Sequence, residues 1–576
     1  MQTYRWEVAP VDPQTLRDYQ RHTGLSRLIC LILASRGIDW EQCDTFLTPM
    51  LSELEDPYAL PGTRAAAERL WQAIERHETI LIHGDYDTDG ITATALTREV
   101  LASCGGHVET FLPHRMDDGY GLTRESIDKA CREHHSVLVT VDCGITSLEA
   151  VEAARGRGID VIVTDHHEPS DEIPAASAVI DPKLSGASAR VRELAGVGVA
   201  FKLCHAFLKY GREHELGGFG AELKDVLDLV ALGTVADIVP LVDENRRLVK
   251  PGLETLSRQL RPGVRALCEI AGVKDVIRAS DIAFRLAPRI NASGRMGDPS
   301  MSLRLLESSS MSDALPLARA LEEENRRRQQ LEMQALEEAE KQIAARCDLE
   351  AGRTIVVWGD AWHQGVLGIV AARLTRQYHR PAIVLTRDSE GALSGSGRSI
   401  DSLNLVVALE ATRSLLTRYG GHPMAAGLSL HPDNVEDFAA QFEETVHATL
   451  PRDAMRPSLD VCGEATLDEV DDAFLAELTA LEPFGQGNPP PVLLTRSVLP
   501  ERIRRVGQGH SKGILRDEFG GWLEFIAFGQ SPDSLPEPPW DVVYRPQLNS
   551  YNGKNIAQAS VMDVHSTFAD AASDGV

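Results

Sequence analysis

The sequence predicts an α/β protein with two lobes, which are joined by a long helix and followed by a small C-terminal β-barrel. From about residue 61 to 312, buried-strand patterns alternate with helical patterns, which is typical of a mainly parallel sheet covered by helices. Strand and helix patterns over 351–455 predict a second α/β unit. Between the two regions, residues 313–350 follow one helical pattern. After residue 455, short strand-like runs stand between turns rich in glycine and proline.

Length and composition restrict the functional classes. A chain of 576 residues is too long for a single hydrophobic core, so several domains are expected. The nine cysteines include no Cys-x-x-Cys pair, which argues against a zinc ribbon or a disulfide framework. Because there is no signal peptide or apolar segment of membrane length, we expect a cytoplasmic protein with no membrane partner. With a net charge of −27, a polyanionic partner would need local basic stripes or bound cations.

The first chemical motif stands at the end of a predicted buried strand. Residues 1–60 carry little chemical signal, and a helical pattern over 61–77 leads into the apolar run Ile80–Ile82. The sequence His-Gly-Asp-Tyr-Asp-Thr-Asp-Gly follows over residues 83–90, and a helical pattern over 91–101 comes next. Three carboxylates this close repel one another unless protons or cations neutralise them. Oxygen ligands suit Mg²⁺ or Mn²⁺, so the motif predicts a metal site.

An Asp-x-Asp-x-Asp-Gly motif also opens the calcium loop of an EF-hand, in which a glutamate stands at the twelfth position. Counted from Asp85, that position is Leu96, and the residues before the motif have strand rather than helix character. The calcium loop is therefore excluded. A surface turn that is merely rich in aspartate is the remaining alternative, and the buried strand before it argues against this alternative.

Two further predicted strands end in metal-binding residue types. Val137–Val141 ends at Asp142, and Val161–Thr164 ends at Asp165-His166-His167, with a helical pattern between them. In open α/β sheets, ligand sites lie beyond the carboxyl ends of the strands. We therefore expect the acids and histidines of three strands to meet in one pocket.

The apolar stretch 228–241 contains two acids, Asp228 and Asp237. Acids in such a run are costly unless they are paired or bound to metal, although Asp237 could equally cap a helix. The segment from Arg285 to Arg295 carries arginines and small polar residues but no acid. It is either an ordinary loop or a phosphate-binding segment, because guanidinium groups match phosphate oxygens.

The second lobe begins after the long helical pattern, whose heptads are too irregular for a coiled-coil arm. Residues 354–358 and 382–385 have strand patterns, and a glycine-started helical pattern over 365–373 lies between them. The Ser/Gly-rich segment 394–399 predicts a loop. It is either a simple turn or a loop whose backbone amides surround an anion.

The C-terminal region has the pattern of a small barrel similar to an OB fold. Strand-like runs occupy residues 513–515, 523–528, 542–548 and 556–564. The arginines at 502, 504 and 505 stand near Phe519, Trp522 and Phe525 in sequence, a combination suited to single-stranded nucleic acid. The aromatic side chains could instead belong to the core.

These motifs, in this order, resemble the DHH phosphoesterase superfamily. The resemblance rests on His83–Gly90, Asp142-Cys-Gly and Asp165-His166-His167, while Gly420-Gly-His with Ala425-Ala-Gly is similar to the accessory DHHA1 domain. Within the superfamily the sequence is most similar to the RecJ-type exonucleases. That similarity adds the segments 288–295, 362–366 and 483–485 and the C-terminal β region, and it covers roughly residues 60–565.

The resemblance implies five parts. They are an N-terminal segment (1–60), a DHH catalytic domain with a mainly parallel sheet (61–312), a connecting helix (313–350), a DHHA1 domain (351–455) and an OB-like nucleic-acid-binding domain (456–576).

The resemblance also implies residue roles. Two divalent ions, Mn²⁺ or Mg²⁺, would be held by Asp85, Asp87, Asp89, Asp142, His166 and Asp228. Asp142 would bridge the ions, Asp85 would be a ligand or lie just behind the ligands, and His167 would be catalytic and face the scissile phosphate. The 5′ phosphate and the DNA would contact Arg115, Arg289, Asn291, Arg295, Ser396, Arg398 and His422. His83 and Asp237 are further candidates.

A member of this family is expected to be a single-stranded-DNA-specific 5′→3′ exonuclease in DNA repair and recombination, which hydrolyses phosphodiesters by a two-metal mechanism to give 5′-mononucleotides. The implied partners are single-stranded DNA, a single-strand binding protein and a helicase, and the implied state is a monomer. One alternative is another DHH phosphoesterase, such as a nanoRNase or a 3′-phosphoadenosine phosphatase, although those chains are shorter and lack the β domain. A second is a non-enzymatic DNA scaffold related to the replication factor Cdc45, which is expected to lack metal ligands.

Overall fold

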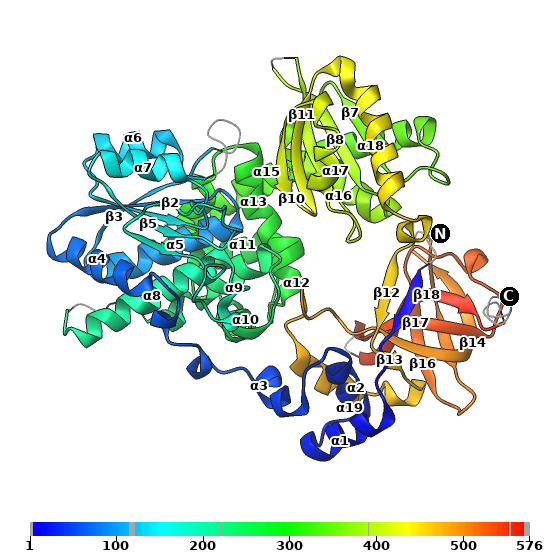
Figure 1. Cartoon of the computed structure of the whole chain (residues 1–576). Helices are drawn as coiled ribbons and strands as arrows, with labels where there is room; N and C mark the ends of the chain where they lie inside the picture. Colours follow the sequence, from blue (N-terminus) through cyan, green and yellow to red (C-terminus); the bar gives the residue numbers. More distant parts are fainter. Residues whose placement is uncertain are drawn as a thin grey trace. The chain divides into compact units, whose positions relative to one another are not determined.

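The structure is a computed structural model that describes residues 4–114, 121–217, 220, 222–389, 391–507, 509–551 and 554–568 (Figure 1). The chain forms two compact units. One contains Pro49–Gln330 together with the short segment Pro483–Pro489, and the other contains Met1–Thr48, Leu331–Glu482 and Pro490–Val576.

The first lobe is built on a five-stranded parallel sheet in the order β3-β2-β4-β5-β6. Its strands are β2 (Thr79–Gly84), β3 (His107–Phe111), β4 (Val137–Val141), β5 (Asp160–Thr164) and β6 (Ala178–Ile180). Helices cover both faces: α4 (Thr63–Glu75), α5 (Thr88–Ser103) and α8 (Gly196–Glu213) on one, α6 (Arg124–Arg132) and α7 (Leu148–Gly156) on the other (Figure 1). The predicted strands and their parallel arrangement are confirmed.

The strand sequences explain the two layers. Ile80 and Ile82 of β2 point into the core formed with α4, α5 and α8, whereas Leu81 points into the core formed with α6 and α7. Successive side chains of a strand alternate between faces, so a strand that is covered on both sides must be apolar throughout.

A group of helices completes this unit. They are α9 (Leu227–Ala236), α10 (Asp243–Ser257), α11 (Pro262–Ala271), α12 (Ala279–Asp281), the π-helix Ile282–Leu286, α13 (Ala287–Met296) and α14 (Ser300–Leu306). The loop expected as one alternative for 285–295 is wrong, because this segment is helical. Pro288 stands in the first turn of α13, where proline costs no hydrogen bond. Gly294 lets the helix approach the loop of the first motif, since a Cβ there would lie 2.5 Å from the carbonyl oxygen of Tyr86.

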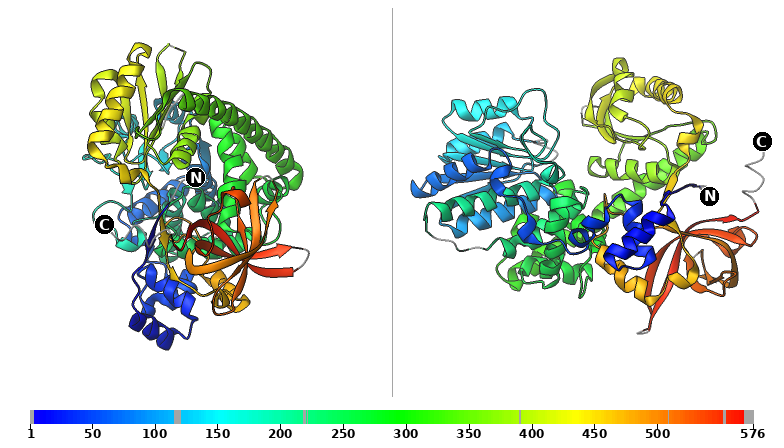
Figure 2. Two further views of the ribbon diagram at one scale, coloured as in Figure 1. Left: turned by 90° about the vertical axis from the view of Figure 1, so that its right-hand side faces the viewer. Right: turned by 60° about the horizontal axis from the view of Figure 1, so that its bottom comes forward.

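The predicted connecting helix is confirmed as α15 (Met311–Arg346), a single helix that is seen along much of its length in Figure 2. Its N-terminal part up to Gln330 belongs to the unit of the first lobe, and its C-terminal part from Leu331 belongs to the other unit.

The second lobe has a mixed sheet in the order β10-β11-β9-β8-β7, in which only β7 and β8 are parallel. Its elements are β7 (Ile355–Gly359), α16 (Gln364–Tyr378), β8 (Ala382–Arg387), β9 (Leu393–Arg398), α17 (Leu405–Glu410), β10 (Leu416–His422), β11 (Ala425–Leu430) and α18 (Val435–Thr449).

The loop predicted for 394–399 is wrong, because most of this segment forms the central strand β9. Its glycines lie where neighbouring atoms leave no room for a side chain: a Cβ at Gly395 would lie 2.0 Å from the carbonyl oxygen of Val384. Pairing with β8 and β11 on both sides therefore overrides the low strand propensity of glycine and serine.

The C-terminal region is a closed five-stranded barrel, which confirms the predicted OB-like fold. Its strands are β14 (Leu493–Val506), β15 (His510–Arg516), β16 (Trp522–Ala527), β17 (Trp540–Tyr551) and β18 (Lys554–Ser566) (Figure 2). The order β14-β15-β16-β18-β17 closes because β17 also pairs with β14. The long strand β14 was not predicted, because Pro500 and several charged residues interrupt its pattern and its pairing shifts register twice.

The N-terminal segment is folded against this C-terminal region. Strand β1 (Arg5–Val8) pairs with β12 (Ser458–Val461), and helices α1 (Pro13–Thr23), α2 (Arg27–Ser35) and α3 (Cys43–Leu47) follow. Arg27 Nε lies 2.5 Å from Oε1 of Glu469. None of the helices in the described ranges is long and apolar enough to cross a lipid bilayer.

Candidate metal centre

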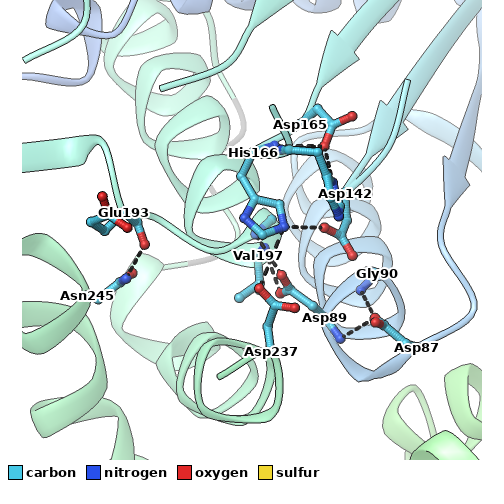
Figure 3. Close-up of polar contacts among 12 residues, drawn as sticks. Asp87, Asp89, Gly90, Asp142, Asp165, His166, Glu193, Val197, Asp237 and Asn245 are labelled. Carbon is cyan, nitrogen blue, oxygen red and sulfur yellow. Dashed lines mark hydrogen bonds and ion pairs between the residues drawn. The ribbon is translucent and has the colours of Figure 1, made fainter. Parts of the chain in front are cut away.

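The first motif places its aspartates at the start of α5. The side chain of Asp87 caps the helix and accepts hydrogen bonds from the backbone N–H groups of Asp89 (2.9 Å) and Gly90 (3.2 Å). The buried carboxylate of Asp89 accepts two more from the N-terminus of α8, from Gly196 (2.7 Å) and Val197 (2.9 Å) (Figure 3). Two helix N-termini thus stabilise these negative charges.

Asp142 follows β4 directly and has a left-handed backbone, with φ 63°. Its side chain is packed against α8, where a Cβ at Gly196 would lie 2.3 Å from Oδ1 of Asp142. Only glycine fits at position 196, because any side chain would displace the Asp142 carboxylate.

The two histidines after β5 have different surroundings. The His166 Nε2 atom lies 3.1 Å from Oδ1 of Asp142 and 3.6 Å from Oδ2 of Asp237 (Figure 3). His167 Nδ1 lies 2.7 Å from Oδ1 of Asp165, which also accepts from the backbone N–H of His166 at 2.7 Å. Asp165 therefore orients both histidines.

The side chains from these strands and from α9 converge. They form three groups, and within each group the possible ligand atoms lie within 4.8 Å of one another. The groups are Asp85, Asp87 and Asp142; Asp89, His166 and Asp237; and Asp142, His166 and His167. The acids and histidines that follow the three strands therefore lie close together, and Asp142 and His166 each belong to two of the groups.

The expectation that Asp228 lies in this pocket is wrong. Its carboxylate is held by Arg261, whose Nε lies 2.9 Å from Oδ2 of Asp228, and Arg261 also binds Glu99 at 2.7 Å. Asp237, at the C-terminal end of the same helix α9, has the position expected for Asp228. The two residues are nine positions apart, which on an α-helix is two and a half turns and places them on opposite faces.

The electrostatics of the cluster fit divalent cations. Burial and the neighbouring carboxylates raise the pKa of Asp237 to about 9 and that of Asp89 to about 7, and they hold the pKa of Asp142 well above its usual range. Burial lowers the pKa of His166 to about 3, so its imidazole is neutral, as a metal ligand must be. Carboxylate oxygens and a neutral imidazole suit Mn²⁺ and Mg²⁺, and a cation would remove the repulsion that raises these pKa values.

Asp165 and His167 each favour the charged form of the other. Burial opposes the ionised form of each, but their mutual hydrogen bond and attraction lower the pKa of Asp165 and raise that of His167. The pair thus favours the protonated form of His167 beside the carboxylates.

Four of the other predicted residues of this lobe lie within the described ranges. His83 is fully buried in β2, with Nε2 3.1 Å from the carbonyl oxygen of Gly121, and it is in none of the groups of possible ligands found among the described residues. Asn291 Oδ1 accepts hydrogen bonds from the backbone N–H (2.7 Å) and the hydroxyl (2.8 Å) of Thr88, at the start of α5. Arg289 Nε lies 2.7 Å from Oε2 of Glu322 on α15. Arg295 is half-buried in the last turn of α13, and Arg115 lies outside the described residues.

In the second lobe, the three predicted DNA-binding residues share one face of the sheet. Arg398 of β9 is opposite Ala425 of β11, which is opposite His422 of β10. Ser396 lies two residues before Arg398, and cross-strand partners project to the same side. Ser396 and Arg398 also lie beside the first turns of α16: a Cβ at Gly368 would be 2.9 Å from Arg398 Nη2.

In the barrel, the aromatic residues named above divide into core and surface. Phe525 is 1% exposed and belongs to the core, whereas Trp522 and Phe519 are 55% and 75% exposed. Trp522 is paired in register with Arg516 on the neighbouring strand β15.

Sequence reasoning missed residues that support the cluster. Gly196 and Val197 donate backbone hydrogen bonds to Asp89. Arg261 forms an ion pair with Asp228, which is in none of the three groups. The run Gly196-Val-Gly-Val was a signal of a helix that begins close to another backbone, but nothing near Arg261 in the sequence points to Asp228.

Comparisons with known proteins agree with this geometry. Family models match the DHH family N-terminal domain at residues 79–234, the DHHA1 domain at 351–448 and the RecJ OB domain at 462–563. The single-stranded-DNA-specific exonuclease RecJ of Bacillus subtilis is 35% identical over 570 residues, which cover 97% of this chain and 70% of that protein. RecJ of Escherichia coli is 37% identical, with 94% of this chain and 96% of that protein covered.

A solved structure is similar over nearly the whole chain. The crystal structure of RecJ from Thermus thermophilus in complex with Mn²⁺ matches with a TM-score of 0.83 and 32% identity, covering 98% of this chain and 79% of that one. A structure of the same protein with Mg²⁺ has a TM-score of 0.77. The converging carboxylates, the three matched domains and these relatives lead to one conclusion: the chain belongs to the RecJ family of single-stranded-DNA-specific exonucleases.

Proposed function

We propose that the chain is a metal-dependent exonuclease that degrades single-stranded DNA from its 5′ end and releases 5′-mononucleotides. The observation that carries this proposal is the convergence of carboxylates and imidazoles at the ends of β2, β4, β5 and α9. They form groups in which the possible ligand atoms lie within 4.8 Å of one another. Such a site serves hydrolysis, whereas a non-enzymatic scaffold has no need to keep several costly buried carboxylates.

The residues that hold two Mn²⁺ or Mg²⁺ ions would be Asp85, Asp87, Asp89, Asp142, His166 and Asp237. When bound, the ion pair would activate water and neutralise the leaving oxygen of a phosphodiester. Asp142 is a member of two of these groups and would therefore contribute to the binding of both ions.

The protein itself supplies orientation and charge. Asp165 holds His167 through Nδ1 and raises its pKa, and the protonated ring would donate a hydrogen bond to a non-bridging oxygen of the scissile phosphate. Asn291 fixes the start of α5 and with it Asp87 and Asp89, so we assign it a positioning role rather than a contact with DNA.

The polarity would come from a site for the terminal phosphate in the second lobe. Ser396 and Arg398 lie beside the N-terminal turns of α16, where backbone N–H groups and the helix dipole favour an anion. We propose His422, Arg295 and Arg115 as further DNA contacts. Arg289 is a candidate only if DNA displaces it from Glu322.

The exposed Trp522 and Phe519 of the barrel would stack on bases. We also propose the five-part domain division given above, a monomeric state, a cytoplasmic location, and a single-strand binding protein and a helicase as partners.

Product analysis tests the function. The purified chain, incubated with Mn²⁺ or Mg²⁺, should release mononucleotides from linear single-stranded DNA whose 3′ end is blocked, but not from DNA with a blocked 5′ end. It should leave duplex and circular DNA intact, and a chelator should stop the reaction. Asp142→Ala, the matched control, should bind the oligonucleotide without degrading it. Equal attack on circular single strands would contradict the proposal.

A further inference from the structure

The segment Pro483–Pro489 belongs to the compact unit of the first lobe, although the chain on both sides of it belongs to the other unit. It is a closed turn. Gly485 N–H donates to the carbonyl of Asn488 (2.9 Å), and Asn488 N–H donates back to the carbonyl of Gly485 (3.2 Å). The fully buried side chain of Asn488 donates to the carbonyl of Pro483 (2.8 Å). The turn thus has its own internal hydrogen bonds, unlike an extended linker.

The turn binds the loop that follows Asp237. Leu241 N–H donates to the carbonyl of Gln486 at 2.7 Å. Arg246 Nη1, from the first turns of α10, donates to the carbonyl of Pro483 at 3.5 Å. Gly487, with φ 71°, lies directly against the loop, since a Cβ there would be 3.0 Å from Cβ of Pro240. Three residues separate Asp237 from the point at which the turn holds the chain.

The intervening loop is strained. Ile238 has φ 62°, a left-handed backbone that a β-branched residue rarely adopts and that costs on the order of 1–3 kcal/mol. Its side chain is 71% exposed, so side-chain packing does not impose this conformation. The constraint must therefore come from the two ends of the loop, which are α9 on one side and the held residues Pro240 and Leu241 on the other.

A second contact connects the loop to the segment that precedes α8. The buried side-chain amide of Asn245 donates to the carbonyl of Pro240 at 3.0 Å and to that of Glu193 (Figure 3). Glu193 precedes the N-terminus of α8, which holds Asp89. The loop after Asp237 is thus fixed both to α8 and to the turn Pro483–Pro489.

We propose that the turn Pro483–Pro489 is a positioning element of the metal centre: by holding Leu241 and Pro240 it keeps Ile238 strained and fixes the carboxylate of Asp237. The proposal rests on the proposed function in one respect, namely that Asp237 is a metal ligand. A segment that follows the first lobe by more than 150 residues in sequence then contributes to the affinity of that lobe for metal.

The test compares two glycines with the same backbone conformation in the full-length chain. Gly487→Val disturbs the turn, whereas Gly24→Val, at φ 70° with no atom within 4 Å of a Cβ, provides the matched control at the end of α1. Mn²⁺ affinity is measured by electron paramagnetic resonance titration. We expect Gly487→Val to weaken Mn²⁺ binding about 10- to 100-fold, as does the loss of groups that support metal ligands, and Gly24→Val to leave it unchanged. High Mn²⁺ should restore nuclease turnover, and the KM for DNA should stay unchanged.

Asn488→Ala, which opens the turn without adding bulk, gives a second test if Gly487→Val does not fold. Hydrogen exchange should then be faster at residues 238–242 in this variant than in the wild-type protein. A folded variant with wild-type Mn²⁺ affinity would overturn the proposal, as would an effect confined to the KM for DNA. If the wild-type protein binds Mn²⁺ but degrades no DNA, the proposed function fails, and the Mn²⁺ titration still decides the role of the turn.

Discussion

At the scale of single residues, two aspartates of α9 have opposite electrostatic surroundings. Asp228 lies beside the guanidinium of Arg261, which satisfies its charge. Asp237 faces other carboxylates and His166, and burial and those carboxylates raise its pKa to about 9. The first arrangement is that of a structural ion pair, and the second is that of a group that requires a cation.

Asn substitutions separate these roles. Asp237→Asn should lower Mn²⁺ affinity and turnover by at least about 100-fold, while the protein remains folded, because the variant loses a charged ligand and relieves repulsion in the metal-free site. Asp228→Asn should lower the free energy of unfolding by about 3 kcal/mol, because it leaves Arg261 without one of its two partners. The folded variant should keep its turnover. Chemical denaturation and Mn²⁺ titration of both variants provide the measurements. Loss of Mn²⁺ binding in Asp228→Asn with normal stability would contradict this assignment.

At the scale of elements, helix α8 makes contacts with several parts of the first lobe. Its N-terminus holds Asp89, and its middle contains the fully buried Lys202, whose Nζ lies 3.0 Å from Oε2 of Glu244 on α10. His205, one turn further on, is half-buried. Burial and the nearby Lys202 lower its pKa to about 4, against a weaker opposite effect of Asp56.

The neutral state of His205 makes stability depend on pH. In the unfolded chain this imidazole takes up a proton near pH 6.5, but in the folded chain it does so only near pH 4. Its contribution to the free energy of unfolding is therefore lost as the pH falls from about 6.5 to 4. Between pH 7 and about pH 5 the Tm of His205→Gln should fall less than that of the wild-type protein. Parallel curves for His205→Gln and the wild-type protein would refute this prediction.

Elements that consist of long apolar runs could be predicted from the sequence. Elements that depend on close contact between backbones could not. The strands β2, β4 and β5 were predicted because both of their faces are buried and apolar. Strand β9 was mistaken for a loop because its Ser/Gly sequence has no hydrophobic pattern, and its pairing with two neighbours decides its conformation. In α13, similarly, the small residues that suggested a loop are those that allow close packing on the first motif.

At the scale of the whole molecule, the net charge of −27 and the buried carboxylate cluster both favour bound cations. The metal-free protein therefore bears a stability cost at this carboxylate cluster. In a chelator, Asp142→Asn should unfold at a higher temperature than the wild-type protein, because it removes one buried like charge and because asparagine tolerates the left-handed backbone at φ 63°.

Addition of Mn²⁺ should reverse this order. At a concentration 100 times its dissociation constant, Mn²⁺ would stabilise the wild-type protein by about 2.7 kcal/mol, while Asp142→Asn gains little. Differential scanning calorimetry with Mn²⁺ and with chelator measures both effects. If Mn²⁺ stabilises the two proteins equally, Asp142 is not part of the binding site.

The sequence by itself determined that a cluster of carboxylates and imidazoles lies at the carboxyl edge of a parallel sheet. The reason is geometric: parallel strands end at the same edge, so Asp85–Asp89, Asp142 and His166 had to meet once their strands were recognised. Only the tertiary structure decided which acid of α9 joins them. Asp228 and Asp237 lie on opposite faces of one buried helix, and the choice depends on how that helix is rotated against α5 and on where Arg261, distant in sequence, is placed. The same holds for the turn Pro483–Pro489, because no local pattern shows that a segment more than 200 residues away holds the loop after Asp237.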